Sequence, residues 1–374
     1  MEKLRVLVVG PAKRQSGGIA RYISEQRRQL AGHVTVDLFD TDTGPVDGPL
    51  DLLRGGLTAL SGWAQFTRCR RPDVVHVHSS HYRSFYLSSF YVLYAAHVWK
   101  RPVILHVHGS SFDEFVRDAS GPVAAFQSLV FDAADTVVVL SDYWKDILAA
   151  RVDEHKLAVL PNAVVHDEYD PVETFSATDD SSVPHVAFVS NHVERKGIRE
   201  TVEAVAALYD RGFEFRTTIA GAGPLSAHAE ELAARYEDVE YVGFVSEADK
   251  RRLLCESSIY VLPTYAEGLP IAILEAMAGG NAIVSTTVGS IPTIVDDENG
   301  VLVPPGDADA LTDGLARLLT DAEATRQMGR TSRRRVVADY SWDGMTDELV
   351  ALYERLAAVA PPDVRPESDP VAND

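Results

Sequence analysis

Two glutamates flank the expected start of a helix in the segment Tyr265–Asn281, which reads YAEGLPIAILEAMAGGN. Glu267 lies before the helix and Glu275 lies within it. Pro270 marks the expected helix start, because proline at the first helical position forgoes no hydrogen bond. Gly279 marks its end, where glycine tolerates the backbone turn. The segment therefore places one carboxylate on each side of a helix N-terminus.

The helix start itself is suited to a phosphate. Free backbone N–H groups at Gly268 and Leu269, together with the positive end of the helix dipole, attract an anion. The carboxylates would repel that anion, but they accept hydrogen bonds from hydroxyl groups. We therefore predict a ligand with a diphosphate between two polyhydroxyl groups, which is a nucleotide-diphosphate sugar. Glu267 would bind the sugar and Glu275 the ribose, unless both are ordinary helix charges in contact with solvent.

These residues need a scaffold, and the chain predicts two similar domains. Six short β-branched runs alternate with helical patterns in residues 1–165, and six more do so in residues 185–340. Apolar runs of this length between helices predict parallel strands that are covered on both faces. We therefore expect an α/β protein with two Rossmann-like, doubly wound parallel-sheet domains in tandem.

The remaining segments connect or close these domains. Residues 166–184 are polar and lack a periodic pattern, which predicts an interdomain linker without regular structure. Residues 341–360 predict a closing helix with Ser341 as its N-cap. Residues 361–374 are acidic and contain several prolines, so we expect a disordered tail.

The composition narrows the classes of partner and compartment. The chain has 55 acidic and 35 basic residues and a formal net charge of −20, which argues against nucleic acid as a partner. An acidic surface poor in lysine suits a salt-rich cytoplasm, so we predict a halophilic source. Cys69 and Cys255 are too few for a disulfide framework. No signal peptide precedes the first strand, and we expect a cytoplasmic protein.

One apolar segment, residues 85–99, raises the question of membrane contact. It is shorter than the roughly 20 residues that span a bilayer. It predicts either a buried helix or an apolar patch that docks on the inner face of a membrane near a lipid acceptor. Arg68, Arg70 and Arg71 would then lie against anionic lipid, or else they form a solvated helix end.

The segment Glu267–Asp307 resembles the signature of the family 4 retaining glycosyltransferases, the group 1 glycosyl transferases of the GT-B fold. Glu267 and Glu275 match the pair of glutamates in that signature, and the resemblance extends through nearly the whole chain. It implies two Rossmann-like domains that face a central cleft. It also implies that the donor binds to the second domain, that the acceptor enters from the first, and that the sugar keeps its anomeric configuration.

Further positions match the same family pattern. Gly17 and Gly18 form a glycine-rich loop after the first strand, at a helix N-terminus that would face the donor phosphate or the acceptor. His108 precedes a glycine at a strand end. The resemblance implies that this histidine lies beside the reacting sugar. Gly221 belongs to the Gly-x-Gly loop of Ala220–Pro224 and would line the nucleotide pocket.

One family position differs in this chain. The family usually has a Gly-Arg pair before a Lys-Gly pair, whereas Ser190 and Asn191 precede Lys196 here. By resemblance, Lys196 neutralises the donor diphosphate and stabilises the charge of the leaving group. Arg195 lies directly before Lys196, and the sequence leaves open whether it replaces the missing arginine.

No cofactor is expected beside the sugar nucleotide. Asp40 and Asp42 form an Asp-x-Asp pair, but they follow an early strand of the first domain, so we do not expect a required metal. His76, His78 and His106 alternate on two neighbouring strands, a pattern that also suits a metal site. We predict instead that they are packed polar residues near the cleft.

The sequence therefore predicts a retaining hexosyltransferase in cell-surface polysaccharide or glycoprotein glycan assembly. It would use a nucleotide-diphosphate sugar and a glycan or lipid-linked acceptor, with His108, Glu267 and Lys196 as catalytic residues. Two alternatives stay open, namely a nucleotide-sugar epimerase or phosphorylase on the same fold, and an inactive homologue that binds sugar nucleotides. The Gly-x-Gly-x-x-Gly spacing of a dinucleotide-dependent dehydrogenase is absent after the first strand.

Overall fold

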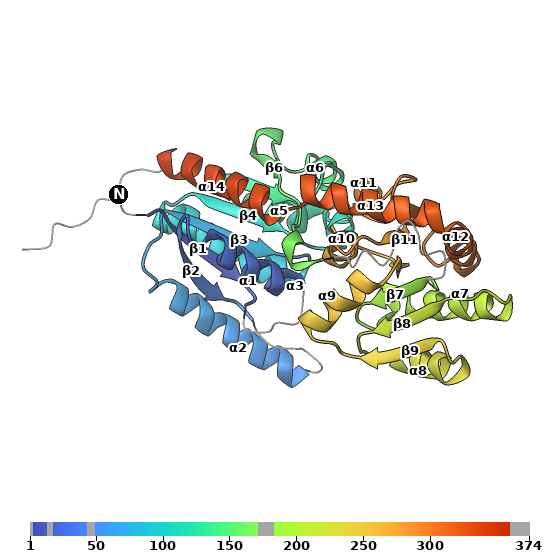
Figure 1. Cartoon of the computed structure of the whole chain (residues 1–374). Helices are drawn as coiled ribbons and strands as arrows, with labels where there is room; N and C mark the ends of the chain where they lie inside the picture. Colours follow the sequence, from blue (N-terminus) through green and yellow to red (C-terminus); the bar gives the residue numbers. More distant parts are fainter. Residues whose placement is uncertain (1–2, 13–17, 43–48, 171–182, 360–374) are drawn as a thin grey trace, which may run out of the picture.

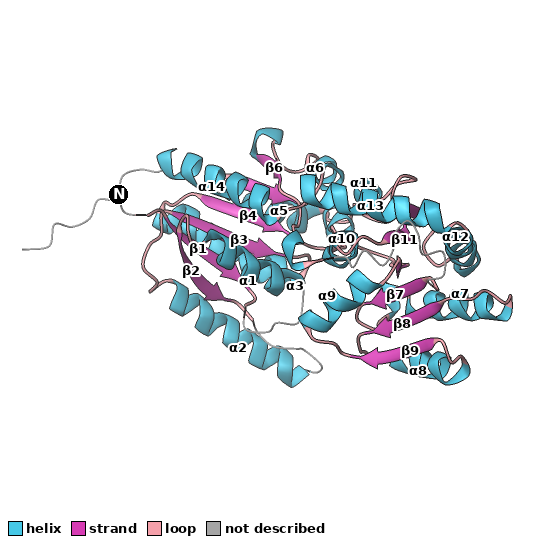
Figure 2. Cartoon of the chain, in the orientation of Figure 1, coloured by secondary structure: helices cyan, strands magenta, loops and turns pink. Residues whose placement is uncertain are grey.

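The computed structural model describes residues 3–12, 18–42, 49–170 and 183–359, apart from the side chains of residues 49–54. Within these ranges the chain forms two parallel β-sheets of six strands each, and helices cover the sheets (Figures 1 and 2). The predicted α/β class with two Rossmann-like parallel sheets is confirmed.

The first sheet has the strand order β2-β1-β3-β4-β5-β6, and its strands pair in parallel. β3 and β4 lie at its centre and are buried along their whole length, as expected for parallel strands covered on both faces. The strands are β1 (Arg5–Gly10), β2 (Thr35–Asp40), β3 (Val74–Ser79), β4 (Val103–Val107), β5 (Thr136–Val139) and β6 (Leu157–Val159).

The helices of this half are α1 (Gly18–Leu30), α2 (Pro49–Phe66), α3 (Arg83–Tyr94), α4 (Phe112–Arg117), α5 (Gly121–Ala133) and α6 (Asp142–Leu148). The apolar segment 85–99 corresponds to α3 and a π-helical turn, Ala95–Trp99, that follows it. Phe85, Val92 and Trp99 are buried there, so the segment packs into the core of the first sheet. Among the helices of the described residues, none has the length and hydropathy of a membrane-spanning segment.

The second sheet has the order β12-β11-β10-β7-β8-β9, again with parallel pairings. Its strands are β7 (His185–Val189), β8 (Arg216–Ala220), β9 (Val239–Gly243), β10 (Ile259–Leu262), β11 (Ala282–Thr286) and β12 (Gly300–Val303). Its helices are α7 (Ile198–Asp210), α8 (Ser226–Arg235), α9 (Glu247–Glu256), α10 (Ile271–Ala278), α11 (Ile291–Ile294), α12 (Ala308–Thr320) and α13 (Ala322–Asp339).

The closing helix, α14 (Trp342–Val359), returns to the first sheet and lies along it (Figure 1). Trp342, Leu349 and Tyr353 are buried in one cluster with apolar side chains of α1, β1 and β4. Ser341 accepts a hydrogen bond from the Gly344 N–H at 3.5 Å, in the manner of the predicted N-cap. A helix from the far end of the chain thus completes the core of the first sheet.

The predicted linker lies mostly outside the described residues. Its first residues are not the structureless segment that was expected, because His166–Glu168 form a turn of 3-10 helix. Tyr169 follows and is buried, with 3% of its surface exposed. The predicted tail, residues 361–374, lies outside the described residues, and the exact domain boundaries stay predictions.

Candidate active site

A cleft of about 420 Å³ lies between the two sheets, at the carboxyl ends of their strands. His108 follows β4, Asn191 follows β7 and Gly221 follows β8, which is the edge where open parallel sheets bind ligands. The lining includes the predicted residues Gly18, His108, Asn191, Arg195, Lys196, Gly221, Glu267, Gly268, Leu269 and Glu275. Gly17 lies outside the described residues.

The loop before α10 is held in place by side chains of the first domain. The indole N–H of Trp144 donates to the Gly268 carbonyl at 3.0 Å, and the Asn162 amide donates to the Leu269 carbonyl at 2.6 Å. A Cβ atom at Gly268 would lie 3.3 Å from the His108 carbonyl oxygen. Glycine therefore suits this close approach of the two domains at the start of α10, because a methyl group would require its neighbours to shift by a few tenths of an ångström.

Glu267 is almost fully buried, with 7% of its surface exposed, and it is surrounded by cations. Its carboxylate forms an ion pair with Lys196 and lies 3.4 Å from the Arg195 guanidinium. The Thr264 hydroxyl donates to the same carboxylate oxygen at 3.2 Å. Arg195 also donates to the Ala266 carbonyl, so its guanidinium is held beside Glu267.

Glu275 is equally buried, with 3% exposed, and it pairs with two cations that the sequence analysis missed. Lys250 on α9 lies 3.0 Å from the carboxylate, and Arg21 on α1 forms a second ion pair with it. Arg21 also pairs with Glu247. The Arg21–Glu275 pair thus joins the first domain to the second across the cleft.

A glycine at the end of β8 allows two loops to meet at the edge of the cleft. Gly221 has φ +123°, and a Cβ atom there would lie 1.8 Å from the Ser190 carbonyl oxygen. Any side chain would collide with the backbone that leads to Asn191, so the position requires glycine. Asn191 is itself exposed to the cleft. Phe244, after β9, is 86% exposed on the same cleft.

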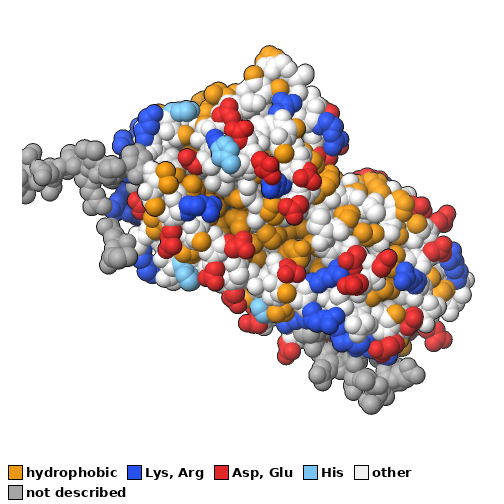
Figure 3. All heavy atoms as spheres, turned by 90° about the horizontal axis from the view of Figure 1, so that it is seen from above, with side chains coloured by type: hydrophobic (Ala, Val, Ile, Leu, Met, Phe, Trp, Pro, Cys, Tyr) orange, Lys and Arg blue, Asp and Glu red, His pale blue; other side chains and the backbone are white. Residues whose placement is uncertain are grey.

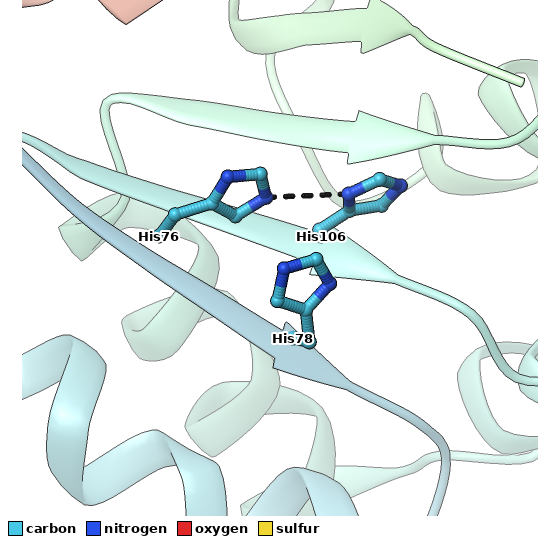
Figure 4. A group of neighbouring side chains, drawn as sticks. All are labelled: His76, His78 and His106. Carbon is cyan, nitrogen blue, oxygen red and sulfur yellow. Dashed lines mark hydrogen bonds between the residues drawn. The ribbon is translucent and has the colours of Figure 1, made fainter. Parts of the chain in front are cut away.

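Histidines of β3 and β4 gather in one buried group beneath the cleft (Figure 4). Ligand atoms of His76, His78 and His106 lie within 4.8 Å of one another, a spacing that a metal ion could use. The group contains no carboxylate to balance the charge of a metal. Instead, its nitrogens form hydrogen bonds, including one of 3.2 Å from His76 Nε2 to His106 Nδ1. The expectation of packed polar residues accounts for this arrangement.

His108 belongs to the same group but also reaches the cleft. Its Nε2 lies 2.8 Å from His78 Nδ1. Burial lowers the pKa of His108 from its ordinary value to about 3, because the low-dielectric surroundings disfavour the charged ring. At neutral pH the side chain is therefore neutral.

A second cavity of about 840 Å³ lies wholly within the first domain, between β2, α2 and α3. Trp63, Tyr91 and Arg83 line it together with Asp40 and Asp42. The Asp-x-Asp pair thus lines a different cavity from Glu267, Glu275 and Lys196, and the expectation that no metal is required stays a prediction. His78 also lines this cavity, and its hydrogen-bond partner His108 lines the cleft.

The two halves of the chain match known families. Residues 4–163 match the description "Glycosyl transferase 4-like domain", and residues 183–321 match "Glycosyl transferases group 1". A putative colanic acid biosynthesis glycosyltransferase, WcaL of Escherichia coli K12, is 30% identical over 239 residues, which make up 61% of this chain and 58% of the relative. The chain spans less than two thirds of the length of this and other curated relatives.

Solved structures share the whole architecture. A sucrose-phosphate synthase of Thermosynechococcus elongatus superimposes with a TM-score of 0.76 at 20% identity, covering 96% of this chain and 100% of that one. The Anabaena protein HepE, in complex with UDP and glucose, superimposes with a TM-score of 0.71 at 15% identity, covering 94% and 100%. These likenesses confirm the predicted arrangement of two domains around a cleft, the GT-B fold.

Proposed function

Because the chain belongs to the group 1 glycosyltransferases, we propose that it transfers a hexose-type sugar from a nucleotide-diphosphate sugar to a glycan or lipid-linked acceptor, with retention of configuration. The observation that supports this activity is the composition of the interdomain cleft. Its lining combines a helix N-terminus, a lysine and two buried glutamates. These groups suit a diphosphate with a hydroxyl-rich group at each end.

The proposed donor lies with its diphosphate at the N-terminus of α10. Gly268 and Leu269 offer backbone N–H groups there, and Lys196 and Arg195 add positive charge from the facing loop. Glu275 would accept hydrogen bonds from the ribose. The exposed ring of Phe244 lies on the same cleft and is a flat surface on which a base can stack.

In the proposed transfer, the bond between the anomeric carbon and the diphosphate oxygen breaks. A bond to the acceptor hydroxyl oxygen forms on the same face of the sugar, and the hydroxyl proton passes to the departing phosphate oxygen. Lys196 stabilises the negative charge that develops on that oxygen. Glu267 and Glu275 pair with different cations, so we do not assign them as the acid and nucleophile of a glycosidase-like mechanism.

The acceptor is proposed to approach from the first domain. The cavity between β2, α2 and α3 has a mixed lining of aromatic rings and charged groups, including Trp63, Tyr91 and Asp42. Such a lining suits a sugar, which packs its apolar face on a ring and donates hydroxyl hydrogens to a carboxylate. The name of the E. coli relative refers to colanic acid biosynthesis, and polysaccharide or lipid-linked glycan assembly is the setting we propose here.

The first experiment measures thermal unfolding in high KCl with UDP-, GDP-, ADP- and dTDP-linked sugars. A ligand at 100 times its dissociation constant stabilises the folded state by about 2.7 kcal/mol. One nucleotide class is expected to raise the unfolding temperature of the wild type and to have a weaker effect on Glu275→Ala. The exposed Glu230 of α8 supplies the matched control, since Glu230→Ala should respond like the wild type.

Product analysis then separates this function from its alternatives. Transfer to an added acceptor supports the retaining glycosyltransferase if NMR shows that the transferred sugar has the same anomeric configuration in the product as in the donor. Formation of an isomeric sugar nucleotide without acceptor would indicate an epimerase, and dependence on inorganic phosphate would indicate a phosphorylase. Binding without turnover on any acceptor would indicate an inactive homologue.

A further inference from the structure

A continuous chain of hydrogen bonds runs from the cleft into the core of the first domain. It begins at His108 Nε2, which lies 2.8 Å from His78 Nδ1. His78 Nε2 lies 3.0 Å from the amide oxygen of Gln26 on α1. The amide nitrogen of Gln26 donates to the Tyr353 hydroxyl at 2.9 Å and lies 3.1 Å from His76 Nδ1. One fully buried glutamine therefore connects the histidine at the cleft with α14.

The chemistry of these groups assigns the hydrogen on each ring. An amide oxygen only accepts hydrogen bonds, so the hydrogen of His78 lies on the Nε2 that faces Gln26. A neutral imidazole has a single N–H, so His78 Nδ1 accepts and His108 Nε2 donates. His108 then has no hydrogen on Nδ1. Among the described residues, no hydrogen bond uses that second nitrogen.

We propose that Gln26 is a positioning residue, which acts through His78 to fix the tautomer of His108 with an unprotonated Nδ1 available to a ligand in the cleft. If the amide of Gln26 were reversed, its nitrogen would donate to His78 and the hydrogen of His108 would move to Nδ1. The orientation of a single buried amide thus decides whether His108 accepts or donates a hydrogen bond.

Two properties of the surroundings support a single, persistent tautomer. Gln26 and His76 have no exposed surface and His78 has 3%, so their hydrogen bonds are largely shielded from bulk solvent. Burial lowers the pKa of His78 well below its ordinary value, and the neighbouring His76 and His108 lower it further. The rings are therefore neutral at neutral pH, and each has one N–H whose place the chain determines.

The consequence for the reaction rests on the proposed function. A neutral His108 with a lone pair on Nδ1 accepts a hydrogen bond from a hydroxyl group of the sugar or the acceptor. It does not act as a proton donor from that nitrogen. We therefore assign His108 the task of orienting a hydroxyl group, and Gln26 the task of keeping His108 ready for it.

The test reads the tautomer directly. The wild type with 15N-labelled histidine is studied by two-bond 1H–15N correlation NMR, and the His108→Asn variant assigns the His108 signals by their loss. The wild type is expected to show His108 with its hydrogen on Nε2. Gln26→Met keeps the length of the side chain but removes the hydrogen bonds. It should lower the ratio of the Nε2–H to the Nδ1–H form about tenfold, the equivalent of one net hydrogen bond.

A further variant distinguishes positioning from a general structural role. Gln127 is a second fully buried glutamine, which donates to the Phe115 carbonyl at 2.8 Å and lies outside the chain of histidines. Gln127→Met should therefore leave the tautomer unchanged even where it lowers stability.

The proposal would be overturned by a wild-type His108 that has its hydrogen on Nδ1, or by an unchanged tautomer ratio in Gln26→Met. A metal ion bound by His76, His78 and His106 in the purified protein would also overturn it, because coordination would use the nitrogens that form the chain. None of these readouts requires turnover. If the protein transferred no sugar, the proposed function would fail while the tautomer result stood.

Discussion

The charges around Glu275 illustrate how single residues prepare the cleft. A buried carboxylate is stable only when it is paired, because desolvation strongly disfavours an isolated charge. Lys250 and Arg21 provide the pairing from two different helices. A ribose hydroxyl that hydrogen-bonds to Glu275 must share the carboxylate with these cations. In the proposed donor complex, donor affinity and the ion pairs of Glu275 are therefore coupled.

Removing one of these cations should destabilise the protein. Lys250→Met is expected to lower the free energy of unfolding by about 1–3 kcal/mol, because the buried carboxylate loses a charge-assisted hydrogen bond. In the double variant with Glu275→Gln, part of this loss should be recovered, since no unpaired charge remains. Urea unfolding of the four proteins of this cycle measures the coupling. Strictly additive losses would show that the two side chains do not interact.

The buried histidines predict how stability depends on pH. Burial, together with a smaller effect of His108, lowers the pKa of His76 to about 3, whereas an unfolded histidine titrates near about 6.5. Between these values the unfolded chain binds more protons than the folded one. The free energy of unfolding should therefore fall as the pH is lowered from about 6.5, by up to about 1.4 kcal/mol per pH unit for this residue.

Urea unfolding at about pH 7 and about pH 5 checks this prediction. His76→Asn should have a weaker dependence on pH than the wild type across that interval. Burial raises the pKa of the Glu247 and Asp296 carboxylates, but their ion pairs and hydrogen bonds outweigh it, so the pKa of both is lowered. Both carboxylates therefore stay ionised across this pH interval. An identical slope in the wild type and the variant would show that His76 binds its proton equally in both states.

Site residues could be predicted from the sequence where the pattern that identifies them lies within one short segment. Glu267 and Glu275 stand in one short segment whose proline and glycines mark the helix, so their place at the cleft could be predicted. Arg21 and Lys250 lie in helices that also contain other charged residues. Their importance comes from contacts between distant segments, which no local spacing indicates.

At the scale of elements, the backbone position of the loop before α10 depends on its contacts with the loop after β11. Gly289 has φ +56°, and a Cβ atom there would lie 2.0 Å from the Glu267 carbonyl oxygen. The Ser290 N–H donates to the Gly268 carbonyl at 3.3 Å. The position of Glu267 is therefore set by a neighbouring turn as well as by its own helix.

Gly289→Ala should displace Glu267 and weaken donor binding. Gly212 offers a matched control, because it also has positive φ (+81°) but has open space where an alanine methyl group would lie. Both substitutions cost about 1–2 kcal/mol of backbone strain, and Gly289→Ala should lose about 1–3 kcal/mol more from the collision. Thermal unfolding and nucleotide-sugar binding measure both effects. Equal losses in the two variants would contradict the role of this turn.

The strands were predictable because a short apolar, β-branched run between two helices forms few structures other than a buried parallel strand. Each of the twelve predicted runs corresponds to a strand of one of the two sheets. The 3-10 turn at His166–Glu168 was not predictable from its polar sequence, because it precedes Tyr169, whose burial in the core depends on contacts with distant segments. The return of α14 to the first sheet also depends on contacts that are remote in sequence.

At the scale of the whole molecule, the net charge of −20 acts on folding. Acidic and basic side chains are interspersed on the face shown in Figure 3, around hydrophobic side chains near its middle. Excess negative charge repels itself and destabilises the compact state. The salt-rich cytoplasm that the composition suggests would screen this repulsion.

The unfolding temperature should accordingly rise as KCl is increased from about 0.1 M to about 1 M, because the screening length falls from about 10 Å to about 3 Å. A parallel series in sucrose, which strengthens burial without screening charge, separates the two causes. An unfolding temperature that did not change with KCl would contradict the prediction of a halophilic source.

The path of α14 has a further consequence for the newly made chain. β1, β3 and β4 are synthesised long before Trp342 and Tyr353, which bury apolar side chains of the same cluster. Ribosomes add about 5–20 residues per second, so the passage from β6 to α14 takes roughly 10–40 s. During that time the first domain emerges with an apolar face uncovered. The core of the first domain is therefore completed only after the second domain has been synthesised, and until then apolar surface that a chaperone could bind stays exposed.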